Sequence, residues 1–430
     1  MKKVISKNKI PIKLWLDDIE DGALKQANNL ANLPFAFRHI AIMPDAHQGF
    51  GMPIGGVMAT ENVIVPNAVG VDIGCGMCSV KTSLTEINKD TLKKIMGEIR
   101  KVVPTGFNKH QEKQDENLMP KPHKEVQDVK NNVWSHECEI INQEYDNALK
   151  SLGTLGGGNH FIEIQKGSDG HIWIMIHSGS RNLGYKVADY YDKLAKKLNE
   201  KWFSGVPKEY DLAFLPVDSE EGKAYIKEMN YCIEFALANR KLMMERVIDI
   251  FVEVTGLCNN PDHGLIGALS FRDEGRIGCP VCGHDENKRI YFEPMINIAH
   301  NYAALENHFG KNVWVHRKGA TLAREGTIGI IPGSQGTSSY IVKGLGNPES
   351  FMSCSHGAGR TMGRKQAQRE LSLDKEKKAL DDKGIIHSIR STGDLDEAPS
   401  AYKDINKVME NQKDLVEIIT KLEPLAVIKG

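Results

Sequence analysis

The sequence predicts an α+β protein, built as one large domain over residues 1–430. Three observations predict this class. Short apolar runs bounded by glycine and proline indicate strands, and one long segment has apolar residues at the three- and four-residue steps of a buried helix. Strands and helices do not alternate regularly, as they would in a doubly wound sheet. With 40% apolar and 26% charged residues, the chain has a globular composition and can bury a sizeable core.

The first half of the chain is expected to begin with strands. Apolar runs at residues 39–44, 63–66 and 69–71 alternate with glycines, so strands joined by tight turns are predicted from Phe35 to Val80. The polar stretch 108–132 predicts an exposed loop; its lysines could contact phosphates, although a solvated loop is the commoner case. Two further strands are expected at 161–164 and 172–176.

The second half is expected to begin with a long helix from Ile226 to Val254, whose Cys232 and methionines face the core and whose stop signal is Gly256. His300 is expected to open another helix. Strands and turns are predicted again over 312–340, then a charged helix over 371–382. Apolar residues at helical spacing predict a last amphipathic helix over 405–422.

Charge and cysteine content narrow the class of protein. The net charge is −1, so any contact with nucleic acid must be a local patch. No apolar run is long enough to span a bilayer, and residues 1–9 do not resemble a signal peptide, so we expect a cytoplasmic protein with no membrane partner. Eight cysteines in such a chain indicate reduced thiols in the core or at metals.

Candidate functional residues gather in six glycine-rich or histidine-containing segments: 71–77, 152–163, 175–184, 300–301, 331–340 and 354–360. Asp72 and Cys75 could bend toward one ion, but alone they are more often an Asp in a turn and a buried thiol. Single histidines at the start of a strand or helix are also commonly structural. The hydroxyls, glycines, histidine and arginine of the last two segments suit a phosphate cradle with a nucleophile. The sequence has no Walker A loop.

In this order the six segments resemble the RtcB family of RNA-splicing ligases, of the bacterial type. The resemblance extends to residues 43–47, 55–57, 401–404 and 427–430, and covers most of the chain. It implies an RtcB-like fold with a central metal and nucleotide cleft. It also implies a GTP- and manganese-dependent RNA ligase that joins 2′,3′-cyclic phosphate or 3′-phosphate ends to 5′-hydroxyl ends, in tRNA splicing or RNA repair.

The resemblance assigns roles to single residues. His356 would attack GTP and carry GMP covalently; the RNA 3′-phosphate would take over this GMP, and the 5′-hydroxyl would displace it. Arg181 would anchor RNA phosphate. Two manganese ions would be bound by Asp72, Cys75, His160, His177 and His300. GTP would be held by Asn159, His160, Phe161, Ile162, Glu163, His300, Asn301, Pro332, Gly333, Ser334, Gln335, Ser339, His356, Gly357, Ala358, Gly359 and Lys429.

Departures from the family pattern are few. Gln335 stands where many members have methionine, and Asn182 where glycine is usual. The larger departure is the segment 257–290, an insertion in which a C-x-x-C pair suggests a zinc knuckle. Its ligands would be Cys258, Cys279, Cys282 and His284, with His263 as another candidate. A structural Zn²⁺ site and a plain surface insertion are both consistent with these residues.

Three other functions are consistent with parts of the sequence. A GTP-dependent enzyme that caps nucleic-acid 3′-phosphates without joining them efficiently would use the same residues. A metal-dependent phosphoesterase would use the metal ligands but not His356. A non-catalytic RNA-binding protein would keep only the fold. The family resemblance also makes an archease-like activator a candidate partner.

Overall fold

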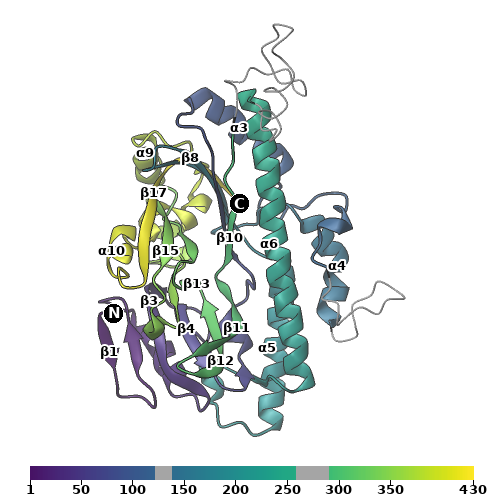
Figure 1. The fold of residues 1–430 in the computed structure, drawn as a ribbon, viewed down its shortest axis with the longest axis vertical. Helices are drawn as coiled ribbons and strands as arrows, with labels where there is room; N and C mark the ends of the chain where they lie inside the picture. Colours follow the sequence, from purple (N-terminus) through teal and green to yellow (C-terminus); the bar gives the residue numbers. More distant parts are fainter. Residues whose placement is uncertain (122–137, 258–289) are drawn as a thin grey trace, which may run out of the picture.

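The computed structural model describes residues 1–121, 138–257 and 290–430, and has two large sheets with a long helix beside them (Figure 1). Sheets and helices belong to one mixed architecture, as the sequence predicts for an α+β protein. The candidate zinc ligands Cys258, Cys279, Cys282, His284 and His263 lie outside the described residues.

The first sheet has six strands in the order β1-β2-β3-β4-β12-β11, antiparallel except for the β2 and β3 pair. Helix α1 packs on it, because Ala27 and Leu30 join a buried cluster with Ile40 and Ile42. Its elements are β1 Lys3–Ile5, β2 Ile12–Leu14, α1 Asp21–Ala31, β3 Ala36–His47, β4 Ile54–Thr60, β11 Asn301–His308 and β12 Lys311–Lys318.

The second sheet has seven strands in the order β10-β6-β8-β7-β17-β15-β14, all antiparallel. The strands β6 to β8 are almost fully buried, and isoleucines make up much of the apolar surface of β7 and β8. The strands are β6 Gly76–Lys81, β7 Phe161–Gly167, β8 Ile172–Ser178, β10 Ile296–Ala299, β14 Ile328–Ile331, β15 Ser339–Gly344 and β17 Val416–Lys429.

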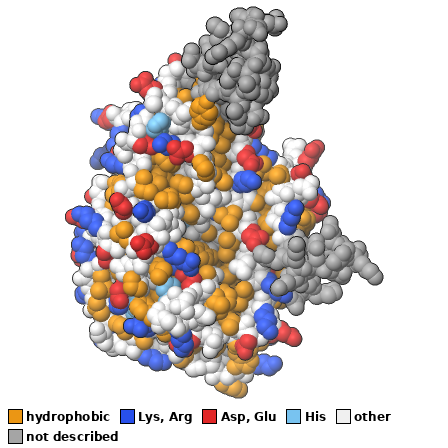
Figure 2. Space-filling view, in the orientation of Figure 1, with side chains coloured by type: hydrophobic (Ala, Val, Ile, Leu, Met, Phe, Trp, Pro, Cys, Tyr) orange, Lys and Arg blue, Asp and Glu red, His pale blue; other side chains and the backbone are white. Residues whose placement is uncertain are grey.

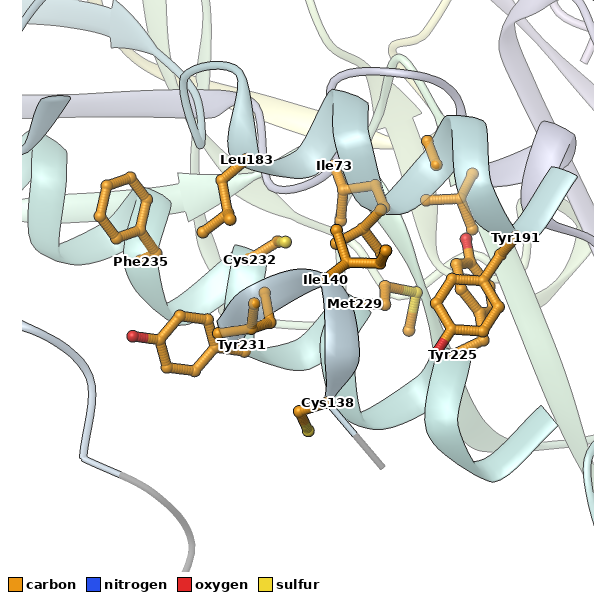
Figure 3. Packing of buried hydrophobic residues seen from close by; sticks show 14 of the residues in the cluster. Ile73, Cys138, Ile140, Leu183, Tyr191, Tyr225, Met229, Tyr231, Cys232 and Phe235 are labelled. Carbon is orange, nitrogen blue, oxygen red and sulfur yellow. The ribbon is translucent and has the colours of Figure 1, made fainter. Parts of the chain in front are cut away.

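Helix α6, Glu220–Thr255, runs along one side of the molecule (Figure 1) and confirms the predicted long helix. The Ser219 side chain caps its first turn by accepting from the Gly222 N–H at 3.0 Å, and Gly256 ends it with φ 65°. Figure 3 shows Cys232 and Phe235 of this helix packed near Leu183 and Ile73. The turn that carries Asp72 and Cys75 therefore rests on a buried apolar base.

The other helices before residue 257 pack against α6 or against one of the two sheets. They are α2 Pro66–Val69, α3 Lys89–Val102, α4 Glu139–Ser151, α5 Leu183–Lys201 and the 3-10 turns Glu116–Leu118 and Lys208–Tyr210; the short strands β5 Val63–Ile64 and β9 Leu215–Pro216 pair with each other. Residues 69–71 were expected to form a strand, and this was wrong. Pro66 occupies the first turn of α2, where its fixed φ and missing N–H favour a helix.

The C-terminal third corrects two further expectations. His300 does not open a helix: it lies between β10 and β11, where its N–H donates to the Cys75 carbonyl at 2.8 Å. The helix expected over 405–422 is only α10, Ile405–Glu410; the chain then forms β17. Its β-branched residues suit a strand that pairs with both β15 and β7, and Pro424 falls at a bulge.

The remaining described elements belong to the C-terminal third of the chain. They are β13 Ala320–Leu322, β16 Ser353–Ser355, α8 Arg364–Glu370, α9 Leu373–Asp381 and the 3-10 turns Pro348–Ser350, Thr392–Glu397 and Pro399–Ala401. The strands expected over 312–340 and the charged helix expected over 371–382 are confirmed.

The surface agrees with the near-zero net charge. On the face in Figure 2, basic and acidic side chains are interspersed. Among the helices of the described ranges, none combines the length and the apolar composition needed to cross a membrane.

Candidate active site

Four neighbouring strands of the second sheet bring the candidate metal ligands together at one end of the strands. His177 lies near the end of β8, and His160 directly precedes β7. Cys75 directly precedes β6, and His300 directly follows β10. Because Gly76 pairs with Ser178 and Ala299, and Phe161 pairs with His177, all four side chains are at the same end of adjacent strands. Sheet register therefore assembles residues that are far apart in the chain.

The ligand atoms form two groups that share one sulfur. Cys75, His177 and His300 make one group, and Asp72, Cys75 and His160 the other; within each group the ligand atoms lie within 4.8 Å of one another. The Cys75 Sγ lies 3.4 Å from the Nε2 atoms of both His160 and His177. The arrangement suits two cations with Cys75 between them.

The chemistry of these donors fits cations. Burial and the neighbouring imidazoles lower the pKa of His177 well below its usual value, so its ring is neutral and can be a ligand. Burial likewise lowers the pKa of His300, and its Nδ1 has no hydrogen-bond partner among the described residues. Burial and the Asp72 carboxylate raise the pKa of the Cys75 thiol, so a bound cation is needed to keep it as a thiolate.

Contacts with neighbouring residues orient the candidate metal ligands. The His177 Nδ1 donates to the Asn159 carbonyl at 3.1 Å, which aims Nε2 at the cluster. A Cβ at Gly179 would lie 2.6 Å from an Asp72 carboxylate oxygen, so a larger residue there would displace this ligand. The triple-glycine turn is equally constrained: a Cβ at Gly156, which has φ 91°, would lie 2.3 Å from the His160 Nδ1.

His356 directly follows β16 and lies beside the cluster, with its ring 4.8 Å from that of His300 between centroids. Its Nδ1 is 2.6 Å from the Oδ2 of Asp45, in β3. The same oxygen accepts the backbone N–H groups of His356 at 3.1 Å and Gly357 at 3.2 Å. Burial raises the pKa of Asp45, but His356 and then Lys403 outweigh burial and hold it below its usual value. Asp45 is therefore an ionised acceptor.

A cavity of about 230 Å³ opens on one side of His356. Most of the residues expected to hold the nucleotide line it: Asn159, Phe161, Glu163, Pro332, Gly333, Ser334, Gln335, His356, Gly357, Ala358, Gly359 and Lys429. Burial raises the pKa of Glu163 to about 8, so its carboxyl can donate as well as accept. Lys429, expected from the family alone, is at the end of β17 with its Nζ 5.6 Å from the Phe161 ring centroid.

Sequence reasoning missed a carboxylate in this cavity. Glu397 is 4% exposed and lies 3.1 Å from Arg360, 3.3 Å from Arg364 and 3.6 Å from Lys429, and it also accepts from the Tyr402 hydroxyl. Its sequence surroundings carry no motif, because its partners come from other parts of the chain. Asp45 was noticed only as part of a resembling segment, without a role.

A second, larger cavity of about 960 Å³ is also lined by His356. It is lined by Asp72, Cys75, His300 and Asn301 from the metal cluster region, and by Phe50, Lys318, Arg360, Arg364 and Lys365. His356 thus lines both cavities, and the larger one also reaches Asp72, Cys75 and His300 of the cluster.

The structure does not bring every expected nucleotide residue to the small cavity. The Ile162 side chain faces away into the core. Ser339 is buried and accepts from the Gly333 N–H at 3.1 Å, which shapes the turn. Asn301 lines the larger cavity, where its side chain joins the Asp72 carbonyl to the Gly319 N–H.

Arg181 lies beside the cluster, with φ 52°. Its Nε donates to Thr154 and one Nη to the Gly106 carbonyl, each at 2.7 Å. The other Nη would meet a Cβ at Gly156 at 2.4 Å, so it is packed against the triple-glycine turn.

Comparisons with known proteins agree with this geometry. A family model described as tRNA-splicing ligase RtcB matches residues 26–265 and 280–430. The "RNA-splicing ligase RtcB" of Escherichia coli (strain K12) is 38% identical over 436 residues, which cover 100% of this chain and 99% of that protein. The "tRNA-splicing ligase RtcB" of Thermococcus kodakarensis is 31% identical, over 98% and 95% of the two chains. That of Nanoarchaeum equitans is 32% identical, over 99% and 96%.

Proposed function

Because the chain belongs to the RtcB family of tRNA-splicing ligases, we propose that it is an RNA ligase that joins 3′-phosphate or 2′,3′-cyclic phosphate ends to 5′-hydroxyl ends. The observation that carries the proposal is the position of His356. Its ring is oriented by Asp45, lines the smaller cavity, and lies beside the Asp72, Cys75, His160, His177 and His300 cluster. This arrangement supports covalent transfer of a nucleotide through His356.

His356 would act as the nucleophile. With the proton on Nδ1, its Nε2 lone pair attacks the α-phosphate of GTP, a bond from nitrogen to phosphorus forms, and pyrophosphate leaves. An oxygen of the RNA 3′-phosphate then takes the GMP from His356. Finally the 5′-hydroxyl attacks the activated 3′-phosphate, GMP leaves, and the strands are joined. A cyclic phosphate end would first be opened to the 3′-phosphate.

Two manganese ions would supply the positive charge that phosphate transfer and pyrophosphate release need. The five-residue cluster would hold them, with Cys75 shared. The ligand types alone also suit zinc, so manganese is proposed from the family resemblance.

The smaller cavity would bind GTP. Glu163 and Lys429 offer a carboxyl and an ammonium group for guanine and phosphate, and the Gly357 to Gly359 turn brings backbone N–H groups close to His356. Arg360 and Arg364 both face Glu397, which keeps their guanidinium groups in place at the boundary of the two cavities. Arg181 would contact RNA phosphate. A cytoplasmic location and an archease-like activator are predictions from the resemblance.

The test is labelling with GTP that carries radioactive phosphorus in its α-phosphate, with manganese present. We expect the wild type and His387→Ala, whose ring lines neither cavity, to become labelled, and His356→Ala to stay unlabelled. Absence of label in the wild type would contradict the ligase and favour the alternative of a metal-dependent phosphoesterase, which does not use His356. Incubation with paired 3′-phosphate and 5′-hydroxyl strands then separates joining from 3′-end capping.

A further inference from the structure

We propose that Phe50 is a stacking platform for a nucleobase at the RNA end that enters the larger cavity. The proposal rests on the proposed function and adds a residue that positions the RNA. Phe50 lies between β3 and β4 and is 73% exposed, although large apolar side chains are usually covered. It lines the same cavity as His356, Cys75 and His300.

The backbone that carries this ring is fixed. The Gln26 side chain donates to the Gly49 carbonyl at 2.6 Å and accepts the Gly49 N–H at 3.1 Å. The Phe50 carbonyl accepts from the Met52 N–H at 2.7 Å. Gly51 has φ 65°, and a Cβ on it would lie 2.5 Å from the Asp211 carbonyl oxygen. The backbone below the exposed ring is therefore held in place and is not the tip of a loose loop.

A buried lysine links this loop to the nucleophile. The Lys318 Nζ donates to the Phe50 carbonyl at 2.5 Å and to the Asn67 carbonyl at 2.9 Å. The next residue, Gly319, packs against the His356 ring. The backbone that carries the Phe50 ring is thus set relative to His356, as a platform for a reacting end needs.

The cations on the cavity wall favour a nucleic-acid strand as the ligand. Arg360, Arg364 and Lys365 line the same cavity as Phe50, and Lys365 is exposed. Sites for single-stranded nucleic acid combine cations that contact the phosphates with aromatic rings on which bases stack. Because a rigid ring loses little conformational entropy on binding, it favours affinity. A base at an RNA end fits both features.

The test measures binding of two single strands, one with a 5′-hydroxyl end and one with a 3′-phosphate end, by fluorescence anisotropy with manganese present. The variants are Phe50→Ala, Phe50→Trp and the matched control Phe203→Ala. Phe203 is 92% exposed but lines a different cavity, beside Lys196 and Lys208. Each strand is also prepared without the base at its terminal nucleotide. GMP labelling of every variant is measured in parallel.

Phe50→Ala is expected to weaken binding of one strand roughly tenfold, with Phe50→Trp and Phe203→Ala close to the wild type. With the abasic form of that strand, the wild type and Phe50→Ala should bind equally. The strand that responds identifies which end stacks. The proposal would be overturned if Phe50→Ala bound both intact strands as tightly as the wild type does. It would also be overturned if Phe50→Ala bound the abasic strands more weakly than the wild type, or if this variant lost GMP labelling. Absence of label in the wild type would instead overturn the proposed function.

Discussion

The Oδ2 of Asp45 lies 2.6 Å from the Nδ1 of His356, and these two residues are 311 positions apart in the chain. Asp45 is fully buried and ionised, so the hydrogen bond requires the proton on Nδ1 of the histidine. The other ring nitrogen then carries the lone pair. Asp45 therefore selects the tautomer in which Nε2 is free to take the nucleophilic role proposed for it, in the way a buried carboxylate orients histidines in other enzymes.

The first prediction is that Asp45→Asn slows GMP labelling of His356 by roughly 10²-fold or more, because an amide can donate to Nδ1 and favour the wrong tautomer. The rate of labelling is measured by quenching at short times. Asp374→Asn, in the exposed first turn of α9, is the control and should label at the wild-type rate. Normal labelling by Asp45→Asn would show that tautomer selection is unimportant.

The second prediction concerns space beside His356. Gly319 has φ 61°, and a Cβ on it would lie 2.4 Å from Ile54 and 3.1 Å from the His356 Cε1. Gly319→Ala should therefore displace the ring and reduce the labelling rate by on the order of tenfold or more. Gly326→Ala is the matched control, since Gly326 has φ 78° and nothing within 4 Å of its Cβ position. If both variants label equally slowly, backbone strain and not ring displacement is the cause.

The third prediction separates two cysteines three residues apart. Cys75 belongs to both ligand groups, whereas the Cys78 thiol donates to the Arg240 carbonyl at 3.8 Å, away from the cluster. Manganese should stabilise the folded wild type by about 2.7 kcal/mol when the free cation is at about 100 times its Kd, and so raise its thermal midpoint. A chelator should reverse this shift. Cys75→Ser should lose most of this shift and Cys78→Ser should keep it. An unchanged shift in Cys75→Ser contradicts the shared-ligand assignment.

Strong periodicity made parts of the fold predictable. Residues 226–254 alternate apolar and polar residues at helical steps and end at a glycine, and α6 is the result. Residues 405–422 show similar steps, yet most of them form no helix. The position between β15 and β7 offers Val416 to Leu422 a strand partner on one edge of β17 and later residues a partner on the other. Such tertiary pairing overrides local spacing and leaves no mark in a short window of sequence.

The site was predictable where motifs mark it and not elsewhere. Cys75, His177 and His300 fall in segments that resemble the family, and the structure brings them together. The contacts of Glu397 with Arg360 and Lys429 depend on how distant segments meet, so no local pattern indicated them. Alternation along β7 also explains why Phe161 and Glu163 reach the cavity while Ile162 does not.

The fourth prediction concerns Lys429, next to the last residue. Its Nζ lies 3.6 Å from Glu397 and above the Phe161 ring, in the cavity proposed for GTP. Lys429→Ala should raise the GTP concentration needed for half-maximal labelling by roughly tenfold, the usual cost of one lost charged hydrogen bond. Lys421→Ala, on the same strand but paired with Glu423 outside the cavity, should leave it unchanged. If both substitutions raised this GTP concentration equally, the cause would be a disturbance of strand β17 and not a lost contact with the nucleotide.

The fifth prediction is a pH dependence of stability away from the site. Glu306 of β11 faces Arg317 at 2.5 and 3.1 Å and His308 at 3.0 Å. Burial raises the pKa of Glu306, but His308 and Arg317 outweigh burial and lower it from 4.5 to about 2. A carboxyl whose pKa is lower in the folded than in the unfolded chain stabilises the fold when the pH is above the unfolded-state pKa. This stability is lost as the pH falls from the unfolded-state pKa toward the folded-state pKa.

At about 1.4 kcal/mol per pKa unit, Glu306 contributes roughly 3 kcal/mol at neutral pH, of which roughly 2 kcal/mol should be lost between about pH 5 and about pH 3. Urea unfolding over this range should therefore show a smaller loss of free energy in Glu306→Gln than in the wild type. Exposed Glu417→Gln should follow the wild type. Parallel curves for all three proteins would mean that Glu306 has the same pKa in the folded and the unfolded chain. Its contacts with Arg317 and His308 would then not favour the charged form.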